Sequence, residues 1–188
     1  MNEAHPCSTL MAVGTWLFSG DSDLFKQPSL YRSTIGALQY LTLTRHDLSF
    51  PVNKLSQFLS APTTLQWQAC KRILWYVKGT LDYGLHFQPT RSLNVECYAD
   101  ADWGSNLEDR RSTSGCCVYM GPNLVQWSSR KQRVVALSST EVEYRALAQT
   151  TTKCVSVKDN GKEKQLSLRG SVDQRFMVLT ASSQNDRT

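Results

Sequence analysis

The sequence, 188 residues long, lacks several features that mark specialised protein classes. It has no run approaching the roughly 18 apolar residues of a membrane span, and its N-terminus lacks the basic and apolar segments of a signal peptide. Its six cysteines form no Cys-x-x-Cys pair, and its three histidines complete no zinc-binding spacing. We therefore expect a soluble intracellular protein, cytoplasmic or nuclear, with no membrane partner and with reduced thiols.

The composition is globular and mildly basic. Hydrophobic residues make up 40% of the chain and charged residues 20%, which is enough apolar material for a core. The length has room for one ordinary domain or two small ones. A net charge of +5 fits an anionic partner such as nucleic acid, but many proteins without such a partner have the same charge. Charge alone leaves both possibilities open.

Helical periodicity fills the region from residue 29 to 79, after a poorly patterned leader over residues 1–28. Three segments repeat apolar residues on one face, and their positions are Tyr31, Ile35, Leu38 and Leu41, then Val52, Leu55, Phe58 and Leu59, then Trp67, Cys70, Ile73, Leu74 and Val77. The Thr63-x-x-Gln66 spacing predicts a capping box for the third helix, and Gly79 is well placed to end it.

Beyond residue 79 the apolar period changes to two. The alternation over 81–87 and 93–99 predicts two strands around a turn at 88–92, and 117–120 with 124–127 predicts another pair. Ser138 and Glu141 predict a capping box that opens a further helix. From Lys153 the chain is polar with isolated apolar pairs, so we expect residues 153–188 to be an unrelated, flexible tail.

Carboxylates gather in two places. An apolar strand ends in Asp100-x-Asp102, where both side chains project from one side and suit Mg²⁺, although a solvated acidic turn explains the spacing equally simply. Glu141 and Glu143 are two residues apart on a helix and point about 200° away from each other, so they cannot share one task. Glu141 occupies the capping position, which leaves Glu143 to approach Asp100; both could also be ordinary first-turn acids.

Ordered sequence blocks between residue 29 and about 152 carry a resemblance to a known family. The blocks occupy 31–41, 71–74, 78–80, 98–103, 109–115, 127–132 and 138–144, and they include Tyr98-Ala99-Asp100-Ala101-Asp102-Trp103 and Ser138-Ser139-Thr140-Glu141-Val142-Glu143-Tyr144. They resemble the reverse transcriptase–ribonuclease H junction in the Pol polyprotein of plant Ty1/copia-type retrotransposons. The resemblance implies an α+β chain with a helical thumb/connection-like region at 29–90 and a truncated ribonuclease H-like domain at 91–152.

The same resemblance implies a function and a site. In this family, ribonuclease H domains cut the RNA strand of RNA–DNA hybrids with a pair of Mg²⁺ ions. Mn²⁺ could replace Mg²⁺, and no small-molecule cofactor is expected. Asp100 matches the first catalytic aspartate, and Glu143, in the form Glu-x-x-Ala, matches the catalytic glutamate; both would bind metal. Asp102 and Glu141 are weaker metal candidates. The residues expected to contact nucleic-acid phosphates are Arg110, Arg111, Arg130, Lys131 and Arg133.

Several expected parts of the family pattern are missing. No Tyr-x-Asp-Asp polymerase motif is present, and nothing after Lys153 resembles the later Asp-Asn strand, because Asp159-Asn160 follows no apolar strand. We therefore expect a three-stranded sheet with one open edge and an incomplete catalytic set, inactive as an isolated chain. Two alternatives stay open: an active ribonuclease H completed by the tail or a partner, and a non-enzymatic nucleic-acid-binding or interaction module.

Overall fold

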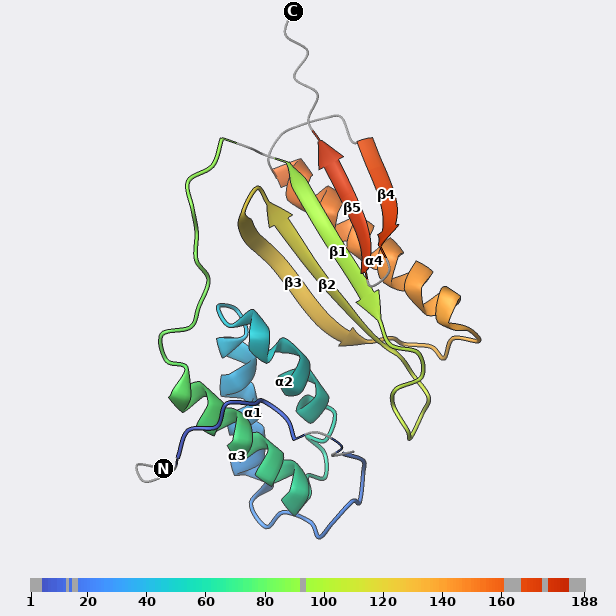
Figure 1. The fold of residues 1–188 in the computed structure, drawn as a ribbon. Helices are drawn as coiled ribbons and strands as arrows, with labels where there is room; N and C mark the ends of the chain where they lie inside the picture. The colour runs from blue at the N-terminus through green and yellow to red at the C-terminus, as the bar shows by residue number, and fades with distance from the viewer. Residues whose placement is uncertain are drawn as a thin grey trace, which may run out of the picture. The chain divides into compact units, whose positions relative to one another are not determined.

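The computed structural model describes residues 5–12, 14, 17–91, 94–160, 167–173 and 176–182. The chain divides into two compact units, Met1–Leu85 and His86–Thr188. The first unit is helical, and the second contains a sheet and one long helix (Figure 1). The expected α+β class is therefore confirmed. Among the described helices, none combines the length and the apolar character needed to cross a membrane.

The first unit contains three α-helices where the periodicity predicts them. They are α1 (Pro28–Leu41), α2 (Ser49–Ser56) and α3 (Thr64–Gly79), and a short 3₁₀ turn, η1 (His46–Leu48), precedes α2. The predicted capping box starts α3: the Gln66 N–H donates to Thr63 Oγ1 (3.4 Å) and the Thr63 N–H donates to Gln66 Oε1 (2.9 Å). Two otherwise unpaired amides of the first turn are thereby satisfied.

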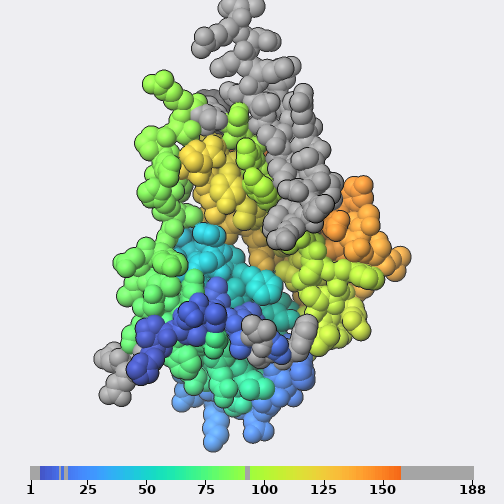
Figure 2. Space-filling model, viewed as in Figure 1, coloured from blue at the N-terminus to red at the C-terminus, as the bar shows by residue number. Residues whose placement is uncertain are grey.

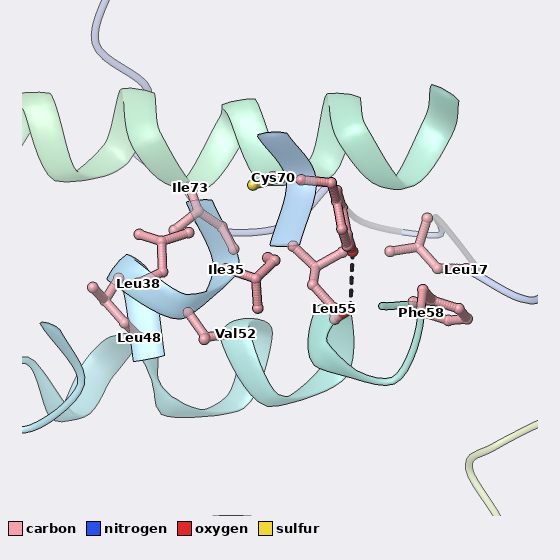
Figure 3. Close-up of a cluster of buried hydrophobic side chains, with 10 residues drawn as sticks. Leu17, Ile35, Leu38, Leu48, Val52, Leu55, Phe58, Cys70 and Ile73 are labelled. Atoms are coloured by element: carbon pink, nitrogen blue, oxygen red, sulfur yellow. Dashed lines mark hydrogen bonds between the residues drawn. The ribbon is translucent and has the colours of Figure 1, made fainter. Parts of the chain in front are cut away.

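The apolar faces of these helices meet in one core (Figure 3). Its buried members are Leu17, Tyr31, Ile35, Leu38, Leu48, Val52, Leu55, Phe58, Cys70 and Ile73. The Tyr31 hydroxyl donates to the Leu55 carbonyl at 2.9 Å, the bond drawn in Figure 3. Burial raises the pKa of Tyr31 well above its usual value, so this donor keeps its proton at neutral pH.

The leader differs from expectation, because its described residues pack on the helices. Leu17 belongs to the core, and Phe25 stacks on Trp67 with ring centroids 4.8 Å apart. The Thr64 N–H donates to the Asp23 carbonyl at 2.9 Å. These contacts satisfy a donor at the start of α3 and bury apolar surface, so this part of the leader belongs to the helical unit.

The second unit is built on an antiparallel sheet in the order β3-β2-β1-β5-β4. Its elements are β1 (Val95–Ala101), β2 (Thr113–Met120), β3 (Asn123–Lys131), α4 (Ser139–Asn160), β4 (Ser167–Asp173) and β5 (Phe176–Ser182). Val95 and Cys97 of β1 are buried in a cluster with Cys154 of α4. Alternate residues such as Asp100 face the other side of the sheet. Figure 1 shows α4 lying along one face of the sheet.

Two sequence-based predictions about strands are wrong. Residues 81–87 form no strand. Leu81, Tyr83 and Phe87 are exposed, so the alternating apolar residues do not form a buried strand face. The edge of β1 is also not open, because β5 pairs with it from Val95↔Ala181 to Ala99↔Met177. The sheet therefore has five strands rather than three, and pairing with β5 satisfies backbone groups that an open edge would expose.

The segment expected to be a flexible tail is largely regular structure. Helix α4 continues through residue 153 to Asn160, held by Cys154 and Val157, which pack in the sheet's core cluster. Residues 167–173 and 176–182 pair with each other as β4 and β5. The prediction is wrong for those residues, while 161–166, 174–175 and 183–188 lie outside the described residues, as does Leu93 of the predicted first strand.

Candidate nucleic-acid and metal site

All of the predicted site residues lie at one end of the sheet. Strand β1 ends at Ala101 opposite Ser114, and β2 begins at Thr113 opposite Lys131, the last residue of β3. Antiparallel pairing thus brings the loop after β1 and the loop before α4 to the same end. We call this region, residues 100–114 and 130–145, the loop end.

Asp100 is the predicted first catalytic aspartate. It is exposed on the sheet face opposite the buried side chains of Val95, Cys97 and Ala99. One carboxylate oxygen, Oδ1, accepts the N–H of Ala101 at 2.9 Å. Within the described part of the chain the other oxygen makes no hydrogen bond or ion pair, so Asp100 retains an oxygen that could bind a cation.

Glu143 is the predicted catalytic glutamate. It is exposed on α4, directly after the buried Val142 and before the exposed Tyr144. Among the described residues its carboxylate makes no hydrogen bond or ion pair. Sequence and structure together place Asp100 and Glu143 at the same end of the sheet, and their shared metal site stays a prediction.

Asp102 closes the loop that follows β1. Its Oδ1 accepts the N–H of Thr113 at 2.6 Å, and its Oδ2 accepts the hydroxyl of Ser105 at 2.6 Å. Both carboxylate oxygens of Asp102 therefore accept hydrogen bonds from the loop. These bonds explain an acid at this position without a metal, and they are consistent with Asp102 being the weaker ligand candidate.

Glu141 caps α4 as the sequence predicts, with one change of partner. Its N–H donates to Ser138 Oγ at 3.2 Å, and its carboxylate accepts the N–H of Leu137 at 2.8 Å instead of that of Ser138. Arg145 also donates to this carboxylate at 2.5 Å. The Leu137 bond, aided by Arg145 and opposed by slight burial, lowers the pKa of Glu141. Glu141 is thus occupied by the helix start.

The predicted phosphate-binding cations divide into two groups. Lys131 and Arg111 both face Asp109, at 2.8 Å and 3.6 Å. Arg110, Arg130 and Arg133 are exposed, and they form no ion pair with another described residue. Arg110 also has a φ of +55°, a left-handed backbone that residues with a Cβ rarely adopt. Three guanidinium groups at the loop end are therefore available to an anionic partner.

Comparison with known proteins identifies the family. The chain is 43% identical over 152 residues to the retrovirus-related Pol polyprotein from transposon RE2 of Arabidopsis thaliana, which covers 81% of this chain and 10% of that protein. It is 48% identical over 126 residues to the uncharacterized mitochondrial protein AtMg00810 of the same plant, covering 67% of this chain and 52% of the relative. The secreted RxLR effector protein 161 of Plasmopara viticola is also 48% identical over 126 residues, covering 66% of this chain and 89% of the relative.

The chain belongs to the Ty1/copia-type retrotransposon Pol family. It spans about a tenth of the length of the RE2 Pol polyprotein and about half that of AtMg00810. No protein-family model matches the chain. No solved structure matches it either.

The described residues of this Pol-family chain do not by themselves fit a two-ion Mg²⁺ centre. Among the described residues, no group of three or more His, Cys, Asp or Glu side chains could hold a metal ion. Asp100 and Glu143 keep free oxygens, whereas Asp102 and Glu141 use theirs within the protein. Two carboxylates with water can serve one Mg²⁺, but a two-ion centre needs ligands on both sides of the phosphate.

The backbone of Asp159 is distant from Glu143 along α4. It lies in the last turn of α4, sixteen residues after Glu143, which is about 24 Å along a helix that rises about 1.5 Å per residue. The end of β4 is nearer. Asp173 pairs with Phe176, and the next residue, Met177, pairs with Ala99 of β1. The backbone of Asp173 therefore lies toward the end of β1 that belongs to the loop end, and sequence patterning gave no indication of it.

Proposed function

We propose that the second unit is a ribonuclease H-derived module that binds RNA–DNA hybrids without cutting them. The helical unit derives, on this proposal, from the thumb and connection of a reverse transcriptase. The observation that supports the proposal is the set of exposed charged side chains at the loop end. At this end of the sheet three arginines and two carboxylates are exposed, while two further acids are occupied in the fold.

Binding follows from the arginines. Arg110, Arg130 and Arg133 can each approach a backbone phosphate, and neutralising a phosphate releases its condensed counterions. The interaction is then strongly dependent on salt and weakly dependent on sequence. Acids at the same end tend to repel phosphates, but Asp109 and Glu141 are each matched by a basic neighbour.

The absence of cutting follows from the acids. In this family, paired metal ions supply the activated water and stabilise the leaving oxygen. This chain offers Asp100 and Glu143, with too few oxygen ligands for a second ion to offset the cost of its dehydration. Binding energy from the arginines is therefore expressed as affinity rather than as a faster reaction.

Hybrid binding can be tested by fluorescence polarisation with a labelled RNA–DNA hybrid over a series of salt concentrations. For Arg133→Ala we expect weaker binding and a plot of log affinity against log salt that is shallower by about 0.9, one phosphate contact. Arg91→Ala, which removes an exposed arginine outside the loop end, is the matched control and should change neither the affinity nor the salt dependence. Equal effects of the two substitutions would show that no specific phosphate contact is made there.

One observation favours a second candidate, an active ribonuclease H completed by the β4–β5 hairpin. The strand register brings the backbone of Asp173, the last residue of β4, toward the end of β1 that belongs to the loop end. On this candidate, the chain cuts hybrids and both Asp100→Asn and Asp173→Asn abolish cutting. On the main proposal, the unmodified chain does not cut hybrids, so neither substitution changes the amount of cutting.

A further inference from the structure

The most exposed tryptophan of the described residues lies at the loop end. Trp103 follows Asp102 directly and is 60% exposed, although an indole gains free energy when it is buried. Its ring N–H donates to the carbonyl of Ala136 at 3.3 Å. The polar atom of the side chain is thus satisfied by the protein, and the ring is held by a bond between the two loops while much of it remains open to solvent.

The loop that carries Trp103 is fixed by its own hydrogen bonds. Asp102 bonds Thr113 and Ser105, and the Gly104 N–H donates to Ser112 Oγ at 2.9 Å. Asn106 is 5% exposed and its side-chain oxygen accepts the N–H of Glu108 at 3.0 Å. A ring on a loop of this kind is positioned before any ligand arrives, which lowers the entropy lost on binding.

The chemistry around the ring matches a nucleic-acid strand. Arg110 extends from the same loop, and Arg133 lies in the loop that contains Ala136; both are exposed. An exposed aromatic ring and exposed guanidinium groups on the same two loops are the combination that binds single strands, because every base has a face to stack and every nucleotide has a phosphate. In Figure 2 the loop after β1 (yellow-green) and part of α4 (orange) both form surface on the face shown.

We propose that Trp103 is a stacking platform for an unpaired base of a nucleic-acid strand that runs past the loop end. This inference rests on the proposed function, because it names the form of nucleic acid that the same end prefers. A single strand, or the single-stranded overhang of a hybrid, supplies an unstacked base. A blunt duplex does not, so it binds through the arginines alone.

The test compares binding of a fluorescein-labelled twelve-residue thymidine oligonucleotide with binding of a blunt RNA–DNA hybrid. We expect Trp103→Ala to weaken binding of the single strand by about 5- to 100-fold, the range found for loss of one stacked base, with the salt slope and hybrid affinity unchanged. Trp103→Phe keeps a ring but loses the bond to Ala136, and it should retain most of the affinity. Leu137→Ala, which removes the most exposed apolar side chain of this end, is the matched control and should bind as the unmodified chain does.

The other outcomes overturn the proposal in distinguishable ways. If the unmodified chain binds neither probe, the proposed function fails together with this inference. If it binds and Trp103→Ala binds equally well, only the platform is wrong. If Trp103→Phe and Trp103→Ala lose equal affinity, the ring acts through its bond to Ala136 and is structural. If Trp103→Ala instead abolishes self-association measured by light scattering, the exposed indole belongs to a protein interface.

Discussion

The two units handle buried and exposed polar groups in opposite ways. In the helical unit the guanidinium of Arg45 is buried and fully engaged: it donates to Asp47 at 2.8 Å and 3.0 Å and to the Thr80 carbonyl at 2.8 Å. In the sheet unit, Asp100, Glu143 and Arg110 all face solvent. Satisfied buried charges fix a structure, whereas exposed and unpaired charges are available to a ligand. On the proposed function, the buried network of the first unit contributes to stability and the exposed charges of the second unit contribute to recognition.

The apolar packing shows the same contrast. The helical unit has a closed core contributed by three helices and the leader, with Ile35 completely buried (Figure 3). Among the described side chains of the sheet unit, the fully buried cluster is smaller. It consists of Val95, Cys97, Val118 and Cys154 between the sheet and α4. We therefore expect substitutions in the helical unit to affect stability and substitutions at the loop end to affect binding.

The largest effect is expected for Ile35→Ala. Removing a buried Ile side chain loses its transfer free energy and leaves a cavity, so the free energy of unfolding should fall by about 2–5 kcal/mol. Leu137→Ala removes a side chain that is 91% exposed, and its effect should stay within about 0.5 kcal/mol. Urea denaturation followed by circular dichroism measures both. Equal losses would show that the proposed contrast in packing does not exist.

A smaller effect, dependent on pH, is expected for Asp47→Asn. Burial raises the pKa of Asp47, but hydrogen bonds from Arg45 and Tyr76 and the charge of Arg45 outweigh burial, so the pKa lies below its usual value. A depressed folded pKa contributes stability above the unfolded value of about 3.9, and this stability is lost as the pH falls through the folded pKa.

The unfolding free energy of the unmodified chain should therefore exceed that of Asp47→Asn at pH 7, and the gap should close below about pH 4. Asp82→Asn, which changes an exposed carboxylate of the same unit, is the control and should show little gap at either pH. A gap for Asp47→Asn that persists unchanged into acid would mean that the carboxylate's charge is not what stabilises this network.

The smallest effect on stability is expected from the helix caps, which both units contain. Thr63 is completely buried, caps α3 and donates to Asp21 at 2.5 Å, whereas Ser138 caps α4 from an exposed position. Thr63→Ala should cost about 1–2 kcal/mol and Ser138→Ala about 0.5–1 kcal/mol, because only the first leaves buried polar groups unpaired. Thermal unfolding of the two variants compares them directly. A larger loss for Ser138→Ala would reverse the contrast.

Local signals in the sequence predicted much of the fold. The spacing of Thr63 and Gln66 places a cap that forms as expected, and the three apolar stripes predict α1, α2 and α3. The turn at Gly121 connects β2 and β3 as predicted. These features depend on residues a few positions apart, and the physical rule for each acts at that distance.

Features that depend on distant partners were missed. The alternation of Leu81, Tyr83 and Phe87 resembles a strand, but a strand needs a neighbour to bond and a face to bury. Strand β5 was missed although it has a neighbour to bond, because its partner β1 lies some 80 residues earlier in the chain. Strand β4 was missed because the sequence between β4 and β5, Gln174-Arg175, is not typical of a hairpin. Helix α4 extends beyond the polar Thr150-Thr151-Thr152 because Cys154 and Val157 find apolar partners on the sheet.

The candidate site was only partly predictable for a related reason. The sequence identified four of the six acids and four of the five arginines of the loop end, because motif spacing is local, and it singled out none of Glu108, Asp109 and Arg145. Which carboxylates are occupied depends on loop geometry: Asp102 binds Thr113 across eleven positions, and Glu141 binds Leu137 instead of Ser138. Trp103 attracted no functional hypothesis, because its exposure and its bond to Ala136 exist only in the folded unit.

The most direct test of the central claim, hybrid binding without cutting, is incubation of the full chain with a labelled RNA–DNA hybrid in Mg²⁺ and in Mn²⁺. The same substrate treated with an active ribonuclease H is the positive control. We predict intact RNA with both metals at concentrations where polarisation shows the hybrid bound, and no difference between the unmodified chain and Asp100→Asn. Hybrid-specific cutting that Asp100→Asn abolishes would contradict the account.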